Sequence, residues 1–346
     1  MNRDIRRALQ LQNYTERKAQ SLTNGLKVYY NRLNRNLQKE IILLYEKYGN
    51  DGILNISETN QNLTEQELEL FKSELEEIQN FANSTTNIAY QNEINRMRNR
   101  VRVTRYEEFE VYVKYEIEKV SNEAYNALAI GLAGIYAYSY YRTLFNIETK
   151  IGFGTDFKII NNEDINKVIN RKWINNENYK DRLKVNKDRL YRNVTRTVGQ
   201  DIASSQTAKT VNYNVANNIT TGYNNTVRLA RTEFEKISGD GVFDGYRQSS
   251  VVERYQFLAT LDDRTTDICA DLDLEIFDLS DKKIGINYPP LHSNCRSTTV
   301  DYFEPDEIDA LFAQKQRASR DEYGRGYVLV DANLNYKDWY EMRVGR

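Results

Sequence analysis

Apolar residues recur every three or four positions along most of the chain before residue 250, a spacing typical of amphipathic helices. The clearest series is Leu26, Tyr30, Leu33, Leu37, Ile41, Leu44 and Tyr48. These positions share one face of a long helix, which favours packing against other helices or along a coiled-coil seam. The turn-forming residues "GNDG" at 49–52 predict the end of this helix.

A second helix is predicted to begin after Thr64. Thr64 and Glu67 have the spacing of a capping box, in which each side chain bonds to the backbone N–H of the other residue. The apolar stripe of this helix is Leu68, Phe71, Leu75 and Ile78. The polar run at 84–87 interrupts the pattern, and a third helical stretch follows through Ile94 and Met97.

The helical pattern resumes at about 105–145, and its second half, 124–145, is apolar nearly all round. A membrane span needs about 20 apolar residues, so this segment has sufficient length. Its flanks lack a strong Lys/Arg asymmetry, and its tyrosines are spread along it rather than confined to the ends. These features favour a buried or oligomer-packed helix over a membrane-active one.

Polar residues at 151–164, with Gly and Asn among them, predict a linker to a second helical block. After Gly239-Asp240-Gly241 the pattern changes from helical to strand-like. Alternating apolar residues predict a strand at 254–260, and 274–279 and 295–303 are further strand candidates.

These patterns predict a mainly α fold with long N-terminal amphipathic helices and a small α+β C-terminal module. The expected parts are an N-terminal helical region at 1–150, a second helical block at 151–248, the α+β module at 249–304 and a tail at 305–346. The N-terminal region is expected to serve assembly or partner binding.

Charge and composition narrow the function. The formal net charge of −2 gives no global positive field that would attract nucleic acid. The most basic stretch, 171–196, also contains acidic residues and few aromatic ones, which favours a solvated helix face over a phosphate-binding face. The chain has 26 tyrosines, whose rings can be buried while their hydroxyls contact water. Such residues favour large, partly hydrated contact surfaces, as in a component of an assembly. The charged N-terminus is not a secretory signal, so we expect the cysteines to meet a reducing cytoplasm.

The reactive residues are confined to one module. The only histidine and both cysteines of the chain, His292, Cys269 and Cys295, lie between 258 and 300. Thiolate and imidazole are the ligands that zinc prefers, and the short spacing of His292 and Cys295 lets one turn present both. The fourth ligand would be water or a carboxylate, for which Asp262, Asp263, Asp267 and Asp271 are candidates. The predicted metal site therefore consists of Cys269, His292, Cys295 and Asp262, with zinc as the cofactor.

Three other interpretations of these residues remain open. Cys269 and Cys295 would close a loop if they formed a disulfide. Alternatively, both thiols are buried small hydrophobes while His292 bonds to a turn. A thiol nucleophile with a His base is a further option, although no elbow or oxyanion-hole signature accompanies it.

The same module is rich in groups that fix loops. Arg264 and Arg296 both have the forked guanidinium that binds a carboxylate through two bonds, and we expect at least one of them to hold an internal Asp. Pro289-Pro290 restricts the backbone before the histidine and predicts a rigid turn.

Three motifs resemble the Mu F-like minor head proteins of tailed bacteriophages, also called head morphogenesis proteins. They are "ARTE" at 230–233, "LDDRTTDIC" at 261–269 and "PPLHSNCRS" at 289–297. The positions that fill the family pattern are Asp262, Arg264, Thr265, Cys269, Pro290, His292, Cys295 and Arg296. The resemblance covers roughly 165–303. It departs from the pattern at Ser297, where family members often have another cysteine, and in the absence of a glycine soon after Cys269.

The resemblance implies a minor capsid protein that binds the portal and the procapsid interior and assists head assembly and genome packaging or delivery. Its expected partners are the portal protein, the major capsid or scaffolding protein, and phage DNA, with self-association through the N-terminal helices. Its expected location is the capsid interior near the portal vertex, after assembly in the host cytoplasm. No catalytic residues are expected. The alternatives are a DNA-binding ejection protein with a membrane-active helix and a metal- or thiol-dependent hydrolase.

Overall fold

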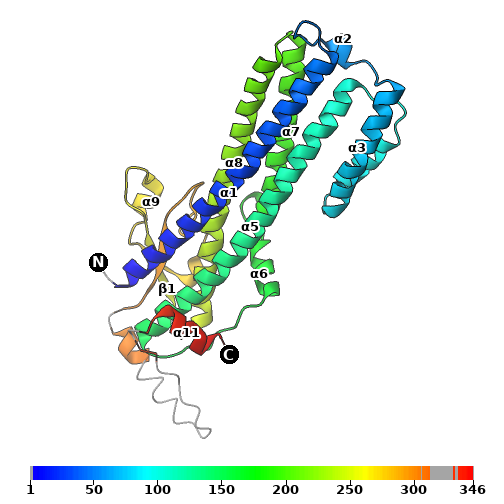
Figure 1. Ribbon diagram of the computed structural model, residues 1–346. Helices are drawn as coiled ribbons and strands as arrows, with labels where there is room; N and C mark the ends of the chain where they lie inside the picture. Colours follow the sequence, from blue (N-terminus) through cyan, green and yellow to red (C-terminus); the bar gives the residue numbers. More distant parts are fainter. Residues whose placement is uncertain (1–2, 305, 312–329, 332–333, 346) are drawn as a thin grey trace. The chain divides into compact units, whose positions relative to one another are not determined.

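A computed structural model describes residues 3–304, 306–311, 330–331 and 334–345 (Figure 1). Long helices dominate these residues, and a small antiparallel sheet lies near the C-terminus. The predicted fold class, mainly α with a small α+β C-terminal module, is confirmed. Most of the expected tail at 305–346 lies outside the described residues.

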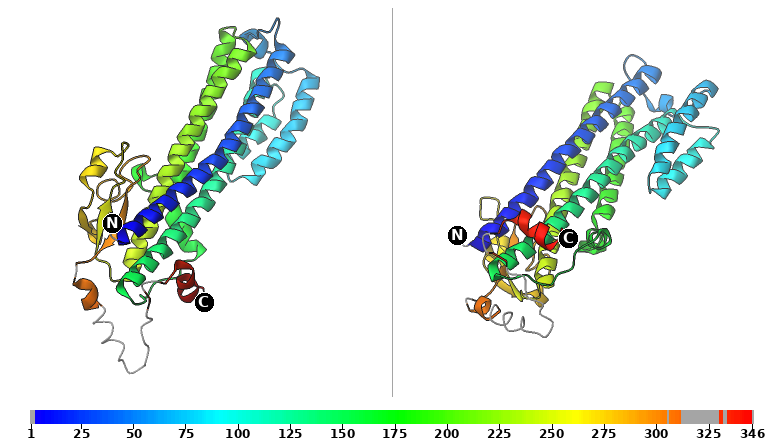
Figure 2. Two further views of the ribbon diagram at one scale, coloured as in Figure 1. Left: turned by 60° about the vertical axis from the view of Figure 1, so that its left-hand side comes forward. Right: turned by 60° about the horizontal axis from the view of Figure 1, so that its bottom comes forward.

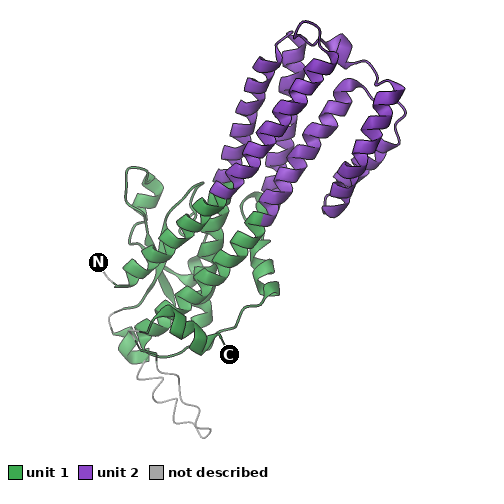
Figure 3. Cartoon of the chain, in the orientation of Figure 1, with its two compact units in different colours: residues 1–23, 127–179, 228–346 green, residues 24–126, 180–227 purple. Residues whose placement is uncertain are grey.

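The chain forms two compact units, each built from separate stretches of sequence (Figure 3). Unit 1 contains Met1–Thr23, Ala127–Tyr179 and Arg228–Arg346. Unit 2 contains Asn24–Asn126 and Lys180–Val227. These units differ from the four consecutive parts expected from the sequence, at 1–150, 151–248, 249–304 and 305–346. That division stays a prediction.

Unit 2 is a helical bundle with a continuous apolar core. It is formed by parts of α1 (Arg3–Tyr48), α5 (Arg105–Ile151), α7 (Tyr179–Ala203) and α8 (Ala208–Ser249). Every position of the series from Leu26 to Tyr48 is buried. Their partners on the other helices include Val113, Ile117, Val120, Leu190, Val194, Val198, Val211, Val215 and Ile219. The predicted helix is thus confirmed, and it begins well before Leu26.

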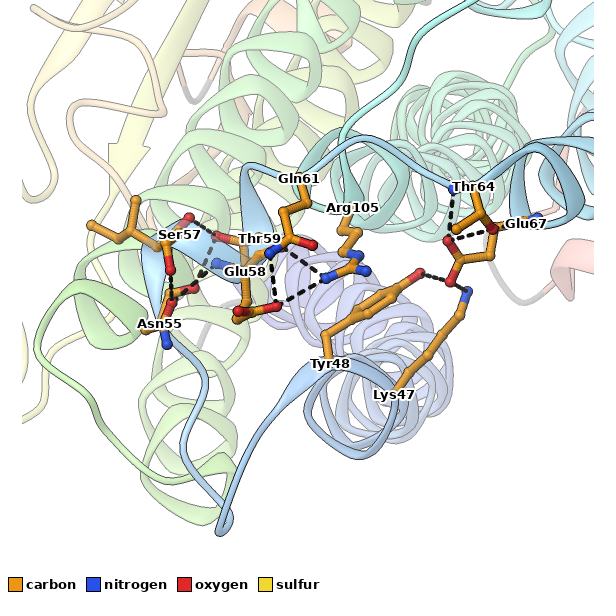
Figure 4. Close-up of polar contacts among 11 residues, drawn as sticks. Lys47, Tyr48, Asn55, Ser57, Glu58, Thr59, Gln61, Thr64, Glu67 and Arg105 are labelled. Carbon is orange, nitrogen blue, oxygen red and sulfur yellow. Dashed lines mark hydrogen bonds and ion pairs between the residues drawn. The ribbon is translucent and has the colours of Figure 1, made fainter.

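A helical hairpin adds a second small core to unit 2. It follows α2 (Ile56–Thr59) and consists of α3 (Glu65–Ser84) and α4 (Ile88–Arg98). The predicted capping box is present: Thr64 N–H donates to Glu67 at 2.8 Å, and Glu67 N–H donates to Thr64 Oγ1 at 3.3 Å. Tyr48 also donates to Glu67, which ties the end of α1 to the start of α3 (Figure 4).

Unit 1 places the N-terminal part of α1 beside the C-terminal parts of α5 and α8 (Figures 1 and 2). Buried hydroxyls link the three helices, because Ser238 Oγ lies 2.9 Å from Thr15 Oγ1 and 2.8 Å from Ser139 Oγ. The apolar stretch 124–145 of α5 contributes buried residues throughout its length, from Ala124 to Phe145. No helix within the described residues is long and apolar enough to cross a membrane.

The helix α8 continues through Gly239-Asp240-Gly241 to Ser249, close to the expected end of the second helical block at 248. Gly241 and Gly245 allow close contact with α5. A Cβ at Gly241 would lie 2.7 Å from the backbone oxygen of Tyr136, and one at Gly245 would lie 2.9 Å from Thr143. Glycine therefore lets α8 approach α5 closely, at a helix-propensity cost of about 1 kcal/mol per residue.

The sheet confirms the three predicted strand regions. Its strands are β1 (Arg254–Leu258), β2 (Ile276–Asp278) and β3 (Thr298–Tyr302), in the order β2-β1-β3. Both pairings are antiparallel; Tyr255 lies opposite Phe277 and Asp301. The short helix α9 (Asp267–Asp271) and the 3-10 turn η2 (Leu279–Asp281) flank β2.

Two further parts of unit 1 close its core. The linker after α5 leads to α6 (Asn162–Ile169) and the 3-10 turn η1 (Ile174–Asn176). At the other end of the chain, α11 (Tyr336–Arg343) is anchored by Glu148, whose side chain is completely buried. Glu148 accepts hydrogen bonds from Trp339 Nε1 at 2.7 Å and from Arg343 at 3.0 and 3.1 Å.

A pair of glycine substitutions tests the close approach of α5 and α8. Gly241→Ala should lower the free energy of unfolding by about 1–3 kcal/mol, because the new methyl group meets the backbone of Tyr136. Gly134→Ala is the matched control, since nothing lies within 4 Å of its Cβ position; it should raise the stability by up to about 1 kcal/mol. Denaturant unfolding measures both, and equal effects would contradict the close packing.

Candidate metal centre

Cys269 lies on α9, and the turn before it is shaped by the "DRT" residues. Asp262 Oδ1 accepts a hydrogen bond from the backbone N–H of Arg264 at 2.9 Å. The backbone N–H of Asp262 donates to Thr265 Oγ1, also at 2.9 Å. Asp262 and Thr265 therefore fold the turn that positions α9, a common role for Asp and Thr side chains.

His292 and Cys295 lie on a loop that follows the buried Pro289–Pro290 pair, whose peptide bond is cis. The Cys295 N–H donates to the His292 carbonyl at 3.2 Å, which closes a tight turn. Asn294 has a φ of 58°, a backbone conformation that asparagine tolerates better than most residues. Its N–H donates to Thr232 Oγ1 on α8 at 3.2 Å, so the "ARTE" segment anchors this loop.

The fold brings the three predicted ligands together. Cys269 Sγ lies 3.3 Å from His292 Nε2 and 3.9 Å from Cys295 Sγ. All three ligand atoms lie within 4.8 Å of one another. In a tetrahedral zinc site the bond lengths place two sulfurs about 3.8 Å apart and sulfur and nitrogen about 3.5 Å apart. The Cys-His-Cys cluster therefore fits a metal ion.

The hydrogen bonds of His292 favour ligation through Nε2. Its Nδ1 lies 3.0 Å from the carbonyl oxygen of Ser293, which only accepts hydrogen bonds, so Nδ1 carries the proton in the neutral ring. Nε2 then presents a lone pair toward Cys269 and also lies 3.0 Å from Thr266 Oγ1. A second hydrogen bond of this kind orients many metal-binding histidines.

The cysteines are free, buried thiols. Their sulfurs are much farther apart than the roughly 2.05 Å of a disulfide bond. Burial raises the pKa of Cys295, because the thiolate loses solvation. This favours the neutral thiol, whereas a bound cation would stabilise the thiolate.

Asp262 does not join this cluster. Its carboxylate accepts two hydrogen bonds from Arg296, at 2.5 and 2.6 Å, and this pairing holds the pKa of Asp262 well below its usual range. Arg296 thus forms the internal clamp that we expected of one arginine. Arg264 is different: its side chain is 73% exposed, and its guanidinium lies 3.7 Å from the Asp262 carboxylate. The geometry supports three protein ligands and leaves the fourth position to another donor.

The most basic stretch, 171–196, is partly used within the protein. Lys187 makes a 2.6 Å ion pair with Glu118, and both side chains are largely buried. Arg196 is exposed and donates to Asn193 on its own helix.

Comparison with known families addresses the motifs directly. Residues 190–300 match the family model described as phage Mu protein F like protein. The chain carries a Mu F-like segment. No curated protein and no solved structure matches the chain.

The Mu F-like segment contains all of the predicted site residues, from Asp262 to Arg296. It also contains the part of α8 on which the His292–Cys295 loop is anchored. The resemblance inferred from the motifs is therefore confirmed, within a range slightly shorter than 165–303. The family is one of bacteriophage head morphogenesis proteins, which are structural components rather than enzymes, and it implies a location in the virion.

A cavity of about 890 Å³ adjoins the Cys-His-Cys cluster in unit 1. His292, Cys295 and Arg296 form one wall, Arg231 and Glu235 of α8 a second, and residues 10–20 of α1 a third. Sequence reasoning missed this cavity. The residues that α1 contributes lie more than 200 positions away from the motifs, and no local pattern marks them.

Glu235 is the most perturbed group in the cavity wall. Its pKa is raised to about 8, mainly by burial and in smaller part by the nearby Glu16 carboxylate. A hydrogen bond from Gln12 Nε2 at 2.9 Å and the charge of Arg296 act in the opposite direction. Glu235 is thus mostly protonated at neutral pH.

The titration of Glu235 predicts how stability depends on pH. Its pKa is higher in the folded chain than in the unfolded one, so the folded state binds more protons between about pH 4.5 and pH 8 and stability falls as pH rises through this window. A full proton difference amounts to about 1.4 kcal/mol per pH unit. Glu235→Gln should flatten this slope in denaturant unfolding at pH 5 and pH 8. Identical slopes for the two proteins would contradict the assignment.

Proposed function

We propose that this protein is a minor capsid protein of a tailed bacteriophage that acts inside the head, near the portal vertex, in head assembly and genome packaging or delivery. The observation that carries the proposal is the match of 190–300 to the Mu F-like family, together with the presence of every motif residue in one folded module. A chain of this kind would enter the particle in few copies.

The proposed partners are the portal protein and the major capsid or scaffolding protein, with self-association through the helices of unit 2. These helices expose several large apolar side chains, among them Val28, Leu43, Leu70 and Ile88. Each is more than half exposed, so the bundle retains apolar surface for another chain. Phage DNA is a further proposed partner.

We propose zinc as the ion of the Cys-His-Cys cluster, in a structural role. Cys269 belongs to α9, whereas His292 and Cys295 belong to the loop before β3, so one ion would join two segments that are separated in sequence. The observed spacing of the three ligand atoms is the support for this choice. Water or another donor would supply the fourth ligand.

Metal analysis tests the zinc proposal. The purified protein should contain about one zinc ion per chain by plasma mass spectrometry, and chelation should lower its melting temperature. His292→Ala or Cys295→Ser should weaken zinc binding by well over tenfold, because even changes behind the ligands cost about 10–100-fold. Ser293→Ala is the control, since only its backbone carbonyl contacts His292. Zinc retained equally in all variants would refute the site.

Particle composition tests the head-protein proposal. Quantitative mass spectrometry of purified particles, scaled to the major capsid protein, should give a few copies of this chain per particle. His292→Ala should lower its incorporation by loosening the C-terminal module, while Ser293→Ala should be incorporated normally. Absence of the chain from both mature particles and their precursors would overturn the proposal.

The two alternative functions have weaker support. A DNA-binding ejection protein would use the basic stretch 171–196, yet Lys187 there is already paired with Glu118. A hydrolase would use the open metal position beside the cavity, or the Cys269 thiol with His292 Nε2 at 3.3 Å as its base, but the Cys269 side chain is buried. Salt-dependent DNA binding and metal-dependent turnover are the measurements that would favour them.

A further inference from the structure

The cavity beside the Cys-His-Cys cluster carries an unusual concentration of positive charge. Four arginines line it: Arg17 from α1, Arg231 from α8, and Arg264 and Arg296 from the C-terminal module. The whole chain has a formal net charge of −2, so this concentration is a local feature rather than a reflection of composition.

The acidic groups nearby do not neutralise these arginines. Asp262 pairs with Arg296 from just outside the cavity, and Glu16 is an acidic residue in the lining. Glu235 also lines the cavity, but it is mostly protonated at neutral pH because burial raises its pKa to about 8. Asp262 lies near both Arg296 and Arg264, and Asp263 also acts on Arg296, so the positive charge without an acidic partner lies on Arg17 and Arg231.

Two of the arginines have no acidic partner. Arg231 donates to the amide of Gln20 at 2.6 Å, and Arg17 donates to the backbone oxygen of Asn13 at 3.3 Å. Within the described residues, no carboxylate lies within ion-pair distance of either guanidinium. Both side chains therefore keep donors for a ligand.

The rest of the lining indicates the chemistry of that ligand. Its other members are mainly polar: Gln10, Asn13, Gln20, Thr266, Ser293 and Asn294. Among the described residues that line the cavity, His292 has the only aromatic ring and no large aliphatic side chain occurs, so the lining suits neither base stacking nor an apolar peptide anchor. A volume of about 890 Å³ is the size of a pocket for a small molecule or a chain end, not for a duplex.

We propose that this cavity binds a phosphate-bearing ligand, held by Arg17 and Arg231 on one side and by Arg264 and the loop at His292–Arg296 on the other. Guanidinium forks match the geometry of phosphate oxygens, and their convergence from three elements suits a compact, highly charged group. The ligand is either a free phosphate compound, such as pyrophosphate, or the terminal phosphate of a nucleic acid strand. This inference stands on the cavity and does not depend on a role in head assembly.

Calorimetric titration of the full chain with pyrophosphate at low ionic strength tests the proposal. Saturable binding is expected, and Arg17→Gln and Arg231→Gln should each weaken it by roughly tenfold, as expected for loss of a charge-assisted hydrogen bond. Arg247→Gln is the matched control, because it removes an exposed arginine from α8 outside the cavity and should change the affinity less than twofold. The melting temperature of each variant reports whether it is folded.

Two further arms identify the source of the phosphate. Tighter binding of an oligonucleotide with a 5′-phosphate than of the same oligonucleotide with a 5′-hydroxyl would assign the site to a strand end. Equal binding of both oligonucleotides, with retained binding of pyrophosphate, would assign it to a free phosphate compound. The neutral chelator 1,10-phenanthroline should leave binding intact, because the arginines and not a metal supply the affinity.

Three outcomes would overturn the proposal. The first is the absence of saturable pyrophosphate binding. The second is an equal loss of affinity in Arg231→Gln and Arg247→Gln. The third is binding of citrate as tight as that of pyrophosphate, which would make the cavity a site for carboxylates, such as an acidic partner segment. None of them would bear on the copy number in particles, so failure here is distinguishable from failure of the head-protein proposal.

Discussion

The close approach of α8 to α5 is the constraint on which unit 1 depends. Gly241 and Gly245 bring the two helix backbones together, because a Cβ at either position would overlap α5. With its position fixed in this way, α8 presents Thr232 to the loop of the metal centre and Glu235 to the cavity. The chemistry of the C-terminal module therefore relies on helix packing that contains none of the reactive residues.

The same helix also holds the region around β2 through charge. Asp240 is buried between two lysines, with Lys236 at 2.8 Å and Lys282 at 3.6 Å. Lys282 lies over the rings of Phe243 and Tyr288, and burial lowers its pKa to about 8 although Asp240 opposes this shift. Removing the charges of Asp240, Lys236 and Lys282 from water costs free energy, and in return the ion pairs fix how Lys282 is placed against α8. The hydroxyl of Tyr288 also donates to the Gly239 carbonyl at 2.7 Å, which adds a neutral contact to the charged one.

Local signals predicted the parts of the fold that are determined locally. The apolar series to Tyr48, the capping box at Thr64 and the three strand regions depend on spacing within one segment, and all are confirmed. The contact of Gly241 and Gly245 with α5 could not be predicted, because no local pattern shows which helix a glycine faces. The α1 residues of the cavity wall could not be predicted from local patterns either, because only the tertiary fold brings Arg17 close to His292.

The predicted metal site also contains residues that sequence identified correctly and one that it did not. Scarcity and spacing identified Cys269, His292 and Cys295, and these side chains do meet. Asp262 was chosen as a ligand because it is acidic and near in sequence, but Arg296 competes for its carboxylate and binds it through two hydrogen bonds. A carboxylate held in this way gains little by turning toward a metal, since it would leave a guanidinium unpaired. The Arg296–Asp262 pair therefore shapes the loops around the cluster. The fourth ligand of a bound metal ion would be water or another donor.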